Sequence, residues 1–278
     1  PTAGVLSSGL PKAGMADGGA VPSGPAIDIA AETPHVSPKS GAGWIIGLVL
    51  VFIGVGAVLV FGVLMALLFP AVQSARSAAR STMCRNNVKL ISLAIINYEA
   101  ANGRFPPAYS VDENGNPLHS WRVLILPYLE EQQLYDKFKL DEPWDSPHNL
   151  AVSEEFMPDC FRCPESASAS YTETSYLGVA GPSAFFATQP RRYQDIRDGT
   201  SKTIMVVEVE SSGVHWTAPR DWDALSTSFL VNGGANEIGS SHGVRGAQIG
   251  FVDGSVIQVD DTTSPLKLEA MTTIAGND

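Results

Sequence analysis

The chain has 278 residues, a formal net charge of -11 and only three cysteines. The negative charge argues against nucleic-acid binding, because a protein that neutralises phosphates needs clustered Lys and Arg. Three cysteines are too few for a disulfide-rich scaffold, although they allow one bridge.

Residues 1–43 are rich in Ala, Gly, Pro and Ser and show no hydrophobic period. Such a composition buries too little apolar surface to offset the entropy of ordering, so we predict a disordered tail. The apolar run that follows is too long for a secretory signal peptide, and no cleavage site is evident.

Residues 44–69, from Trp44 to Phe69, contain no charged side chain. Because about 20 apolar residues are enough to cross a bilayer, we predict a transmembrane helix. Residues 70–102 continue it as an amphipathic helix, with a kink expected near Pro70. Gly103 can take the left-handed conformation that ends a helix. The apolar residues of the second half recur at three- and four-residue spacing, at Ala79, Met83, Leu90, Ala94, Ile95 and Tyr98.

Residues 103–278 are predicted to form a globular head of the α+β class. His119 to Phe138 has a helical apolar face interrupted by Pro127, which predicts two short helices, and residues 141–158 look irregular because they contain three prolines. Asp253-Gly254 between two apolar runs predicts a hairpin in which both turn residues have positive φ. The predicted strands are runs of β-branched and aromatic residues, at 176–179, 203–209, 228–231, 247–252 and 255–259.

The three cysteines allow several interpretations from their spacing alone. Cys160 and Cys163 form a CxxC pair, which is typical of half a zinc site or of a redox pair, and either residue could instead be bridged to Cys84. The usual zinc site needs a second CxxC, and a thioredoxin-like pair needs a helix start in a βαβ unit. Neither context is evident here.

Several stretches together resemble a known family. The segment FPAVQSARSAARSTMCRNNVKLISLAIINYEAANGRFPP, Cys163-Pro164, the run Asp198 to Ile204 (DGTSKTI) and a C-terminal histidine followed by Asp253-Gly254 carry the resemblance. It is to the pseudopilin-like proteins abundant in planctomycete bacteria, classed as domain-of-unknown-function family 1559. The resemblance extends from about Phe69 to the end of the chain.

This resemblance implies a type IV pilin-like fold, in which a long N-terminal helix, half in the membrane, packs on an antiparallel sheet. It also implies a structural or secretion-associated role without enzymatic activity, and it pairs Cys84 with Cys163 in a disulfide. The family usually begins its span with G-F-T-L-x-E, whereas this span contains no glutamate. His242 precedes Asp253 by ten intervening residues, where the family usually has nine.

Other residues are candidate sites on their chemistry. His242 and Asp253 are potential acid-base or metal-binding groups. The alternative is that the Asp stabilises its hairpin turn and that the His, in a loop, forms hydrogen bonds with the adjacent backbone. Trp216 lies in a compact patch with Arg220, Asp221 and Trp222. This patch either is exposed and binds a ligand or partner, or its two tryptophans are buried against the sheet. Calcium takes oxygen ligands, so a group of carboxylates is a candidate calcium site, and the alternative is that the chain has no cofactor. The candidate ligands are Asp195, Asp198 and Glu208, with Glu210, Asp221 and Asp223 near them in the sequence.

Two hypotheses follow for function. In the first, the chain is a non-enzymatic subunit of the cytoplasmic membrane that associates with itself or with other pilin-like subunits, helped by small residues such as Gly62 and Ala66. In the second, it is a membrane-tethered enzyme or binding module with a loop site around His242, Trp216 and Asp253. Basic residues after the span favour a cytoplasmic head, whereas the resemblance and its disulfide favour a head outside; we adopt the latter.

Overall fold

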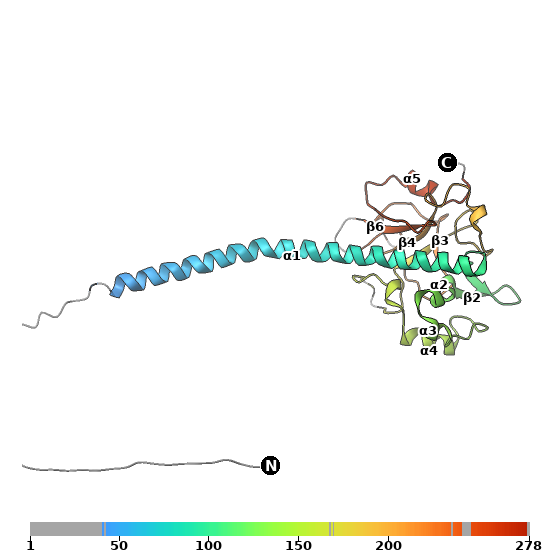
Figure 1. Ribbon diagram of the computed structural model, residues 1–278, viewed down its shortest axis with the longest axis horizontal. Helices are drawn as coiled ribbons and strands as arrows, with labels where there is room; N and C mark the ends of the chain where they lie inside the picture. The colour runs from blue at the N-terminus through green and yellow to red at the C-terminus, as the bar shows by residue number, and fades with distance from the viewer. Residues whose placement is uncertain are drawn as a thin grey trace, which may run out of the picture. The chain divides into compact units, whose positions relative to one another are not determined.

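The computed structural model describes residues 41, 43–166, 168, 170–234, 236–240 and 246–276. The chain divides into two units, Pro1–Leu59 and Val60–Asp278. The long helix α1 (Gly43–Asn102) is followed by short helices and strands (Figure 1). These are β1 (Tyr109–Val111), β2 (Pro117–Ser120), α2 (Trp121–Leu124), η1 (Leu126–Leu129), α3 (Gln132–Tyr135), α4 (Pro147–Glu155), η2 (Asp159–Phe161), β3 (Tyr176–Ala180), η3 (Tyr193–Asp195), β4 (Ile204–Glu208), β5 (Trp222–Asp223), β6 (Ala247–Phe251), β7 (Val256–Val259) and α5 (Pro265–Ala270).

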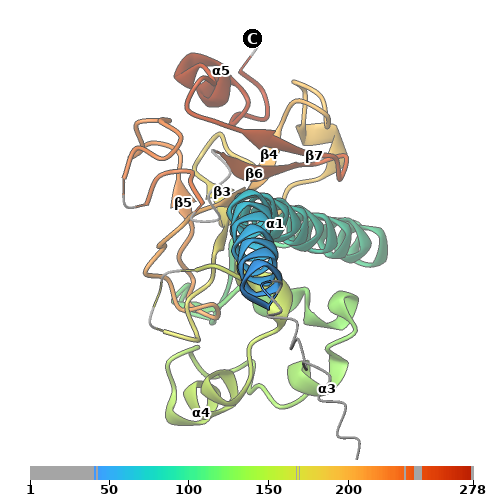
Figure 2. The same ribbon diagram turned by 90° about the vertical axis from the view of Figure 1, so that its left-hand side faces the viewer.

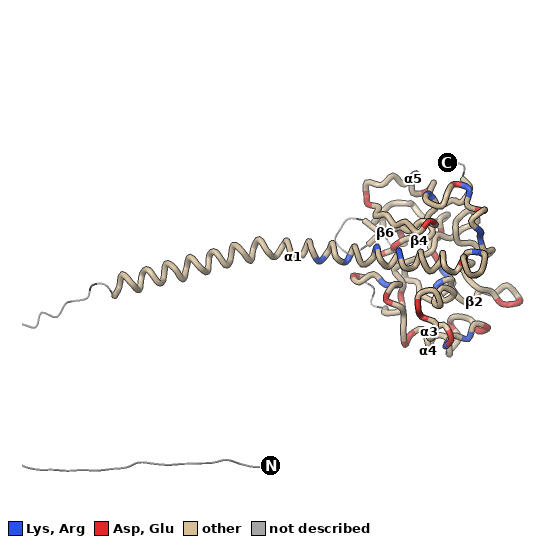
Figure 3. The backbone as a smooth tube through the Cα atoms, viewed as in Figure 1, with Lys and Arg blue, Asp and Glu red and all other residues tan. Residues whose placement is uncertain are grey.

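Helix α1 contains the predicted membrane span. Its most apolar 18-residue window has a mean hydropathy of 2.9 and no buried residue, and it is the one candidate span among the described residues. Figure 3 shows no charged residue along this apolar stretch. The helix passes through Pro70 without interruption. It ends at Asn102 as predicted, where Gly103 has a φ of 70° and its N–H donates to the carbonyl of Glu99 over 2.7 Å.

Within the unit Val60–Asp278, α1 lies between the sheet and the short helices α2 to α4, as both views show (Figures 1 and 2). Its buried residues are Ser81, Cys84, Val88, Ile91, Ser92, Ala94 and Ile95. The predicted apolar face was therefore partly wrong: Met83 and Leu90 are 52% and 51% exposed. The helix carries a second apolar stripe, and the sequence period alone does not tell which of the two is buried.

The main sheet has the strand order β5-β3-β4-β6-β7. Neighbouring strands are antiparallel except β3 and β5, which pair in parallel through Val179 and Trp222. One face contributes Met205 and Val206 to the core around α1, and the opposite face packs with Leu268 of α5 in a second core. The fold is thus α+β, with a long N-terminal helix packed on a sheet, an arrangement consistent with a pilin-like protein.

Close packing of α1 on the sheet depends on Gly250 in β6. A Cβ at this position would lie 2.7 Å from Ser92 Oγ and 2.8 Å from Val88 Cγ1, both on α1. Because real Cβ atoms do not approach that closely, only glycine lets the helix lie this near to β6.

The predicted hairpin joins β6 and β7, but its turn differs from the expected type. Only Gly254 of the pair has positive φ, at 78°. Its N–H donates to the carbonyl of Phe251, and the Phe251 N–H donates to the carbonyl of Ser255, each over 2.9 Å. A turn followed by a left-handed glycine is the next most common hairpin loop, and it needs only one positive φ.

Two other segments differ from the sequence-based expectation. Residues 228–231 form no strand, and Phe229 has a φ of 57°, which a regular strand does not allow. Residues 141–158 are not wholly irregular, because they contain α4. Its start is formed by Ser146, whose Oγ accepts from the Asn149 N–H, and by Pro147 at the first helical position.

Candidate functional site

A cluster of two thiols and a carboxylate is buried where α1 meets the sheet. Cys84 Sγ on α1 donates to Cys163 Sγ over 3.1 Å. Glu208 at the end of β4 joins them, and the three ligand atoms lie within 4.8 Å of one another. Cys84, Cys163 and Glu208 are 0%, 3% and 0% exposed. We call these three residues the thiol-carboxylate cluster. Among the described residues it is the one group of three His, Cys, Asp or Glu close enough to share an ion.

The surroundings of the cluster favour protonated thiol and phenol groups. The pKa of Cys84 is raised far above its ordinary value by its hydrogen bond with Cys163, by burial and by the charge of Glu208. Burial also raises the pKa of Tyr176, and Glu208 and Cys84 add to this. Reactive cysteines need a depressed pKa, so Cys84 is not set up as a nucleophile.

The structure brings together the two cysteines that the family resemblance paired. Both are free thiols in it, so the disulfide itself stays a prediction. Cys160 is also free, and burial raises its pKa to about 12. Cys160 lies outside the thiol-carboxylate cluster.

The proposed calcium ligands do not assemble. Asp195 Oδ2 accepts from the backbone of Arg192, and Asp198 Oδ2 accepts from Thr273 Oγ1 and the Gly276 N–H. Glu208 belongs to the thiol-carboxylate cluster and forms no close group with either aspartate among the described residues. Among the described residues, no group of three metal-ligating side chains contains Asp195 or Asp198.

The turn at Asp253-Gly254 is held by basic residues of α1. Lys89 Nζ donates to the Gly254 carbonyl over 2.5 Å, and Arg85 Nη2 donates to the Val256 carbonyl over 3.1 Å. Asp253 Oδ1 accepts from the Ser255 N–H over 2.8 Å, which is the turn-stabilising role expected of it. His242 lies outside the described residues, so its relation to Asp253 stays a prediction.

Trp216 and Trp222 belong to the interior. Trp216 is fully buried, stacks on Phe161 and donates from Nε1 to the carbonyl of Ser153 over 3.1 Å. Trp222 is 3% exposed and donates to the carbonyl of Asn236. Trp216 is therefore not available to a surface loop site, and Trp222 is a buried residue of β5.

A buried ion pair in the former tryptophan patch was not found from the sequence. Arg122 of α2 and Asp221 are 0% and 3% exposed in their side chains, and Nη2 lies 2.5 Å from Oδ1. The carboxylate also accepts from Trp121 Nε1 and from the Gly178 N–H. Burial raises the pKa of Asp221, and these donors oppose that rise. Arg122 and Asp221 are 99 residues apart, and no spacing rule links them.

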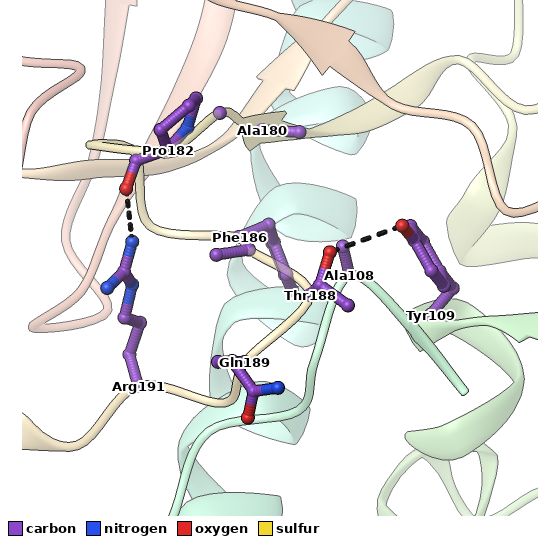
Figure 4. Close-up of a pocket in the computed structure, with 10 residues that line it drawn as sticks. Ala108, Tyr109, Ala180, Pro182, Phe186, Thr188, Gln189 and Arg191 are labelled. Carbon is purple, nitrogen blue, oxygen red and sulfur yellow. Dashed lines mark hydrogen bonds between the residues drawn. The ribbon is translucent and has the colours of Figure 1, made fainter. Parts of the chain in front are cut away.

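An open cavity of about 520 Å³ lies beside β1 and the segment after β3 (Figure 4). Three of its polar side chains form hydrogen bonds within the wall: Arg191 Nη2 donates to the Pro182 carbonyl over 2.6 Å, and Tyr109 and Thr188 share a hydrogen bond. None of the residues proposed from the sequence lines this cavity.

A second apolar stripe runs along the solvent side of α1. Its residues are exposed and alternate at three- and four-residue spacing, and we call them the outer face of α1: Phe69, Val72, Arg76, Ala79, Met83, Asn86, Leu90, Leu93 and Asn97. Leu90, Leu93 and Asn97 also line a groove of about 490 Å³ with Tyr128 and Phe156. Alternation of this kind is the pattern of a helix that packs against another helix.

Comparison with protein families gives a match over residues 73–184 to the family described as "Protein of unknown function (DUF1559)". Residues 73–184 are similar to this family. Comparison with curated proteins and with solved structures gives no match.

The DUF1559 match includes some parts of the candidate site and not others. Cys84, Cys163 and the outer face of α1 from Arg76 onward lie within residues 73–184, whereas Glu208 and the Asp253-Gly254 turn lie after them. A long apolar helix in a chain with this family match indicates a membrane-anchored protein.

Proposed function

We propose that this chain is a pilin-like structural subunit of the cytoplasmic membrane that has no enzymatic activity. It crosses the membrane once and associates through α1 with copies of itself or with related subunits. The observation that carries the proposal is the outer face of α1, where Met83, Leu90 and Leu93 are 52%, 51% and 41% exposed. Single exposed apolar residues are ordinary, but a row of them in helical register favours a partner helix.

The register of the outer face supports a partner of the same kind. Chains anchored in one membrane by the same span enter it in the same direction, so their α1 helices run parallel. Spacing of three and four keeps one stripe facing a parallel partner, and polar Asn86 and Asn97 within the stripe fix the register at some cost in stability.

We further propose that residues 103–278 lie outside the cytoplasm. Basic residues beside a span usually mark its cytoplasmic side, so by that rule the basic residues after this span would place residues 103–278 in the cytoplasm. Arg80 instead pairs with Glu165 over 2.7 Å, and Arg85 and Lys89 bond the β6-β7 hairpin. These charges therefore have a use in folding that does not depend on the side of the membrane.

The proposal predicts that charges placed on the outer face abolish association. In the double variant Leu90→Asp/Leu93→Asp, two carboxylates would be buried without partners between helices, so the dissociation constant of the oligomer should rise roughly 10-fold or more. The measurement is sedimentation equilibrium of the full chain in detergent. The matched control is Leu225→Asp, at a residue that is 77% exposed and off the helix.

A wild-type chain that sediments as a monomer at all concentrations would contradict the proposed self-association. Equal weakening by Leu225→Asp would show that the effect comes from added charge and not from the outer face.

A further inference from the structure

We propose that the thiol-carboxylate cluster binds a thiophilic divalent cation of the zinc class. Its donors come from three separate segments: Cys84 on α1, Cys163 after η2 and Glu208 on β4. Two sulfurs and one carboxylate oxygen are a ligand set that suits zinc. Calcium, by contrast, takes six to eight oxygens and does not favour thiolates.

The distances in the cluster fit this ion after a small adjustment. A tetrahedral zinc with Zn–S bonds of about 2.3 Å holds two sulfurs roughly 3.8 Å apart. The sulfurs of Cys84 and Cys163 are 3.1 Å apart, and all three ligand atoms lie within 4.8 Å. The two sulfurs therefore have to move apart by about 0.7 Å when the ion binds.

Neighbouring groups already orient the proposed ligands. Glu208 Oε2 accepts from the Gln248 N–H over 2.9 Å, and the Cys163 N–H donates to Ser175 Oγ over 2.9 Å. The Tyr176 hydroxyl accepts from Asn87 Nδ2 and interacts with Cys84. Hydrogen bonds of this kind fix ligand orientation at metal sites and are part of their affinity.

Glu208 separates this proposal from the predicted disulfide. A disulfide forms between Cys84 and Cys163 whatever residue occupies position 208, whereas a metal loses one of its ligands when the carboxylate is removed. Glu208→Gln keeps an oxygen that can accept from the Gln248 N–H, so the local hydrogen bond is retained. The variant therefore tests ligation while it preserves the packing.

The test is cobalt binding by the full chain in detergent, after reduction and treatment with a chelator. Cobalt bound to thiolates gives a sulfur-to-metal charge-transfer band, which we expect at one ion per wild-type chain. Glu208→Gln should weaken binding roughly 10- to 100-fold, and Cys84→Ser should remove the band. Cys160→Ser, which changes the cysteine outside the cluster, should leave binding unchanged.

The absence of the band in reduced wild-type chain would overturn the proposal, and this result does not depend on how any variant folds. Unchanged cobalt affinity in Glu208→Gln would also overturn it. So would chain isolated from cells with Cys84 and Cys163 already joined as a disulfide and without bound metal.

Discussion

At the scale of single residues, His119 in β2 is a histidine buried in its neutral form. Its side chain is fully buried, Nε2 lies 3.2 Å from the Lys139 carbonyl, and Nδ1 has no partner among the described residues. Burial lowers the pKa of His119, and the nearby carbonyls of Lys139 and Glu142 oppose this only in part. The folded chain therefore resists protonation at this position.

This burial predicts that acid weakens the fold. As the pH falls below the ordinary histidine pKa of about 6.5, the unfolded chain takes up a proton that folded His119 refuses, so stability present above that pH is lost. The loss is at most about 1.4 kcal/mol per pH unit for one histidine. Urea unfolding followed by tryptophan fluorescence between pH 7 and pH 5 measures it.

His119→Gln should reduce this pH dependence, because glutamine does not titrate. His215, whose pKa is also lowered by burial, should account for part of the remainder. If the variant kept the full wild-type slope, His119 would not be the group responsible.

Residue chemistry was predictable from the sequence where the family resemblance paired two residues or where the partner lies in the same turn. Cys84 and Cys163 were matched in this way, and Asp253 was assigned correctly to its turn. Glu208 was grouped with carboxylates near it in sequence. Its neighbours in space are Cys84 and Cys163, which a strand and a helix bring to it, and sequence spacing does not encode that contact.

At the scale of elements, the ion pair of Arg122 and Asp221 joins α2 to the sheet. Arg122 Nε donates to the Tyr176 carbonyl of β3, and Nη1 donates to Ser120 Oγ at the end of β2. Asp221 accepts from the Gly178 N–H of β3 over 2.8 Å. The pair therefore satisfies polar groups of several elements at one buried position.

Removing one partner of this pair should be costly. Asp221→Asn leaves the Arg122 charge buried without its counter-ion, so we expect the free energy of unfolding to fall by about 3–5 kcal/mol. Denaturant unfolding of the full chain measures the change. The control Asp145→Asn alters an exposed aspartate outside the buried pair and should change stability by about 0.5 kcal/mol or less. Similar losses in both variants would contradict a special role for the buried pair.

Elements with a strong compositional signal were predicted well. The extent of α1 followed from its apolar run and from Gly103, and β3, β4, β6 and β7 followed from β-branched runs. Helix α4 was missed because Pro147 was taken as a breaker, although proline fits the first turn of a helix. The run at 228–231 has strand-like composition, but Phe229 has a φ of 57°, and the N–H and hydroxyl of Ser228 donate to the Glu237 carboxylate and not to a neighbouring strand.

At the scale of the whole molecule, the proposed association depends on the two faces of α1. Within Val60–Asp278, one face of this helix packs on the sheet through residues such as Val88 and Ile91, and the outer face remains exposed. The apolar stretch before it is long enough to cross a membrane. We infer that the fold uses the first face for its own core and leaves the outer face for neighbouring subunits.

The most direct test is chemical cross-linking, in intact cells, of cysteines introduced one at a time on α1. Met83→Cys and Leu90→Cys lie on the outer face, and Thr82→Cys is an exposed control about a quarter turn away. Each is placed in a Cys160→Ser background, whose remaining native cysteines, Cys84 and Cys163, are buried, and is treated with a short bis-maleimide that does not cross the inner membrane. The Cys160→Ser chain without an added cysteine is the blank. We predict that the first two variants give cross-linked dimers and that Thr82→Cys does not. Equal cross-linking at all three positions, or dimers only after the inner membrane is opened, would contradict the account.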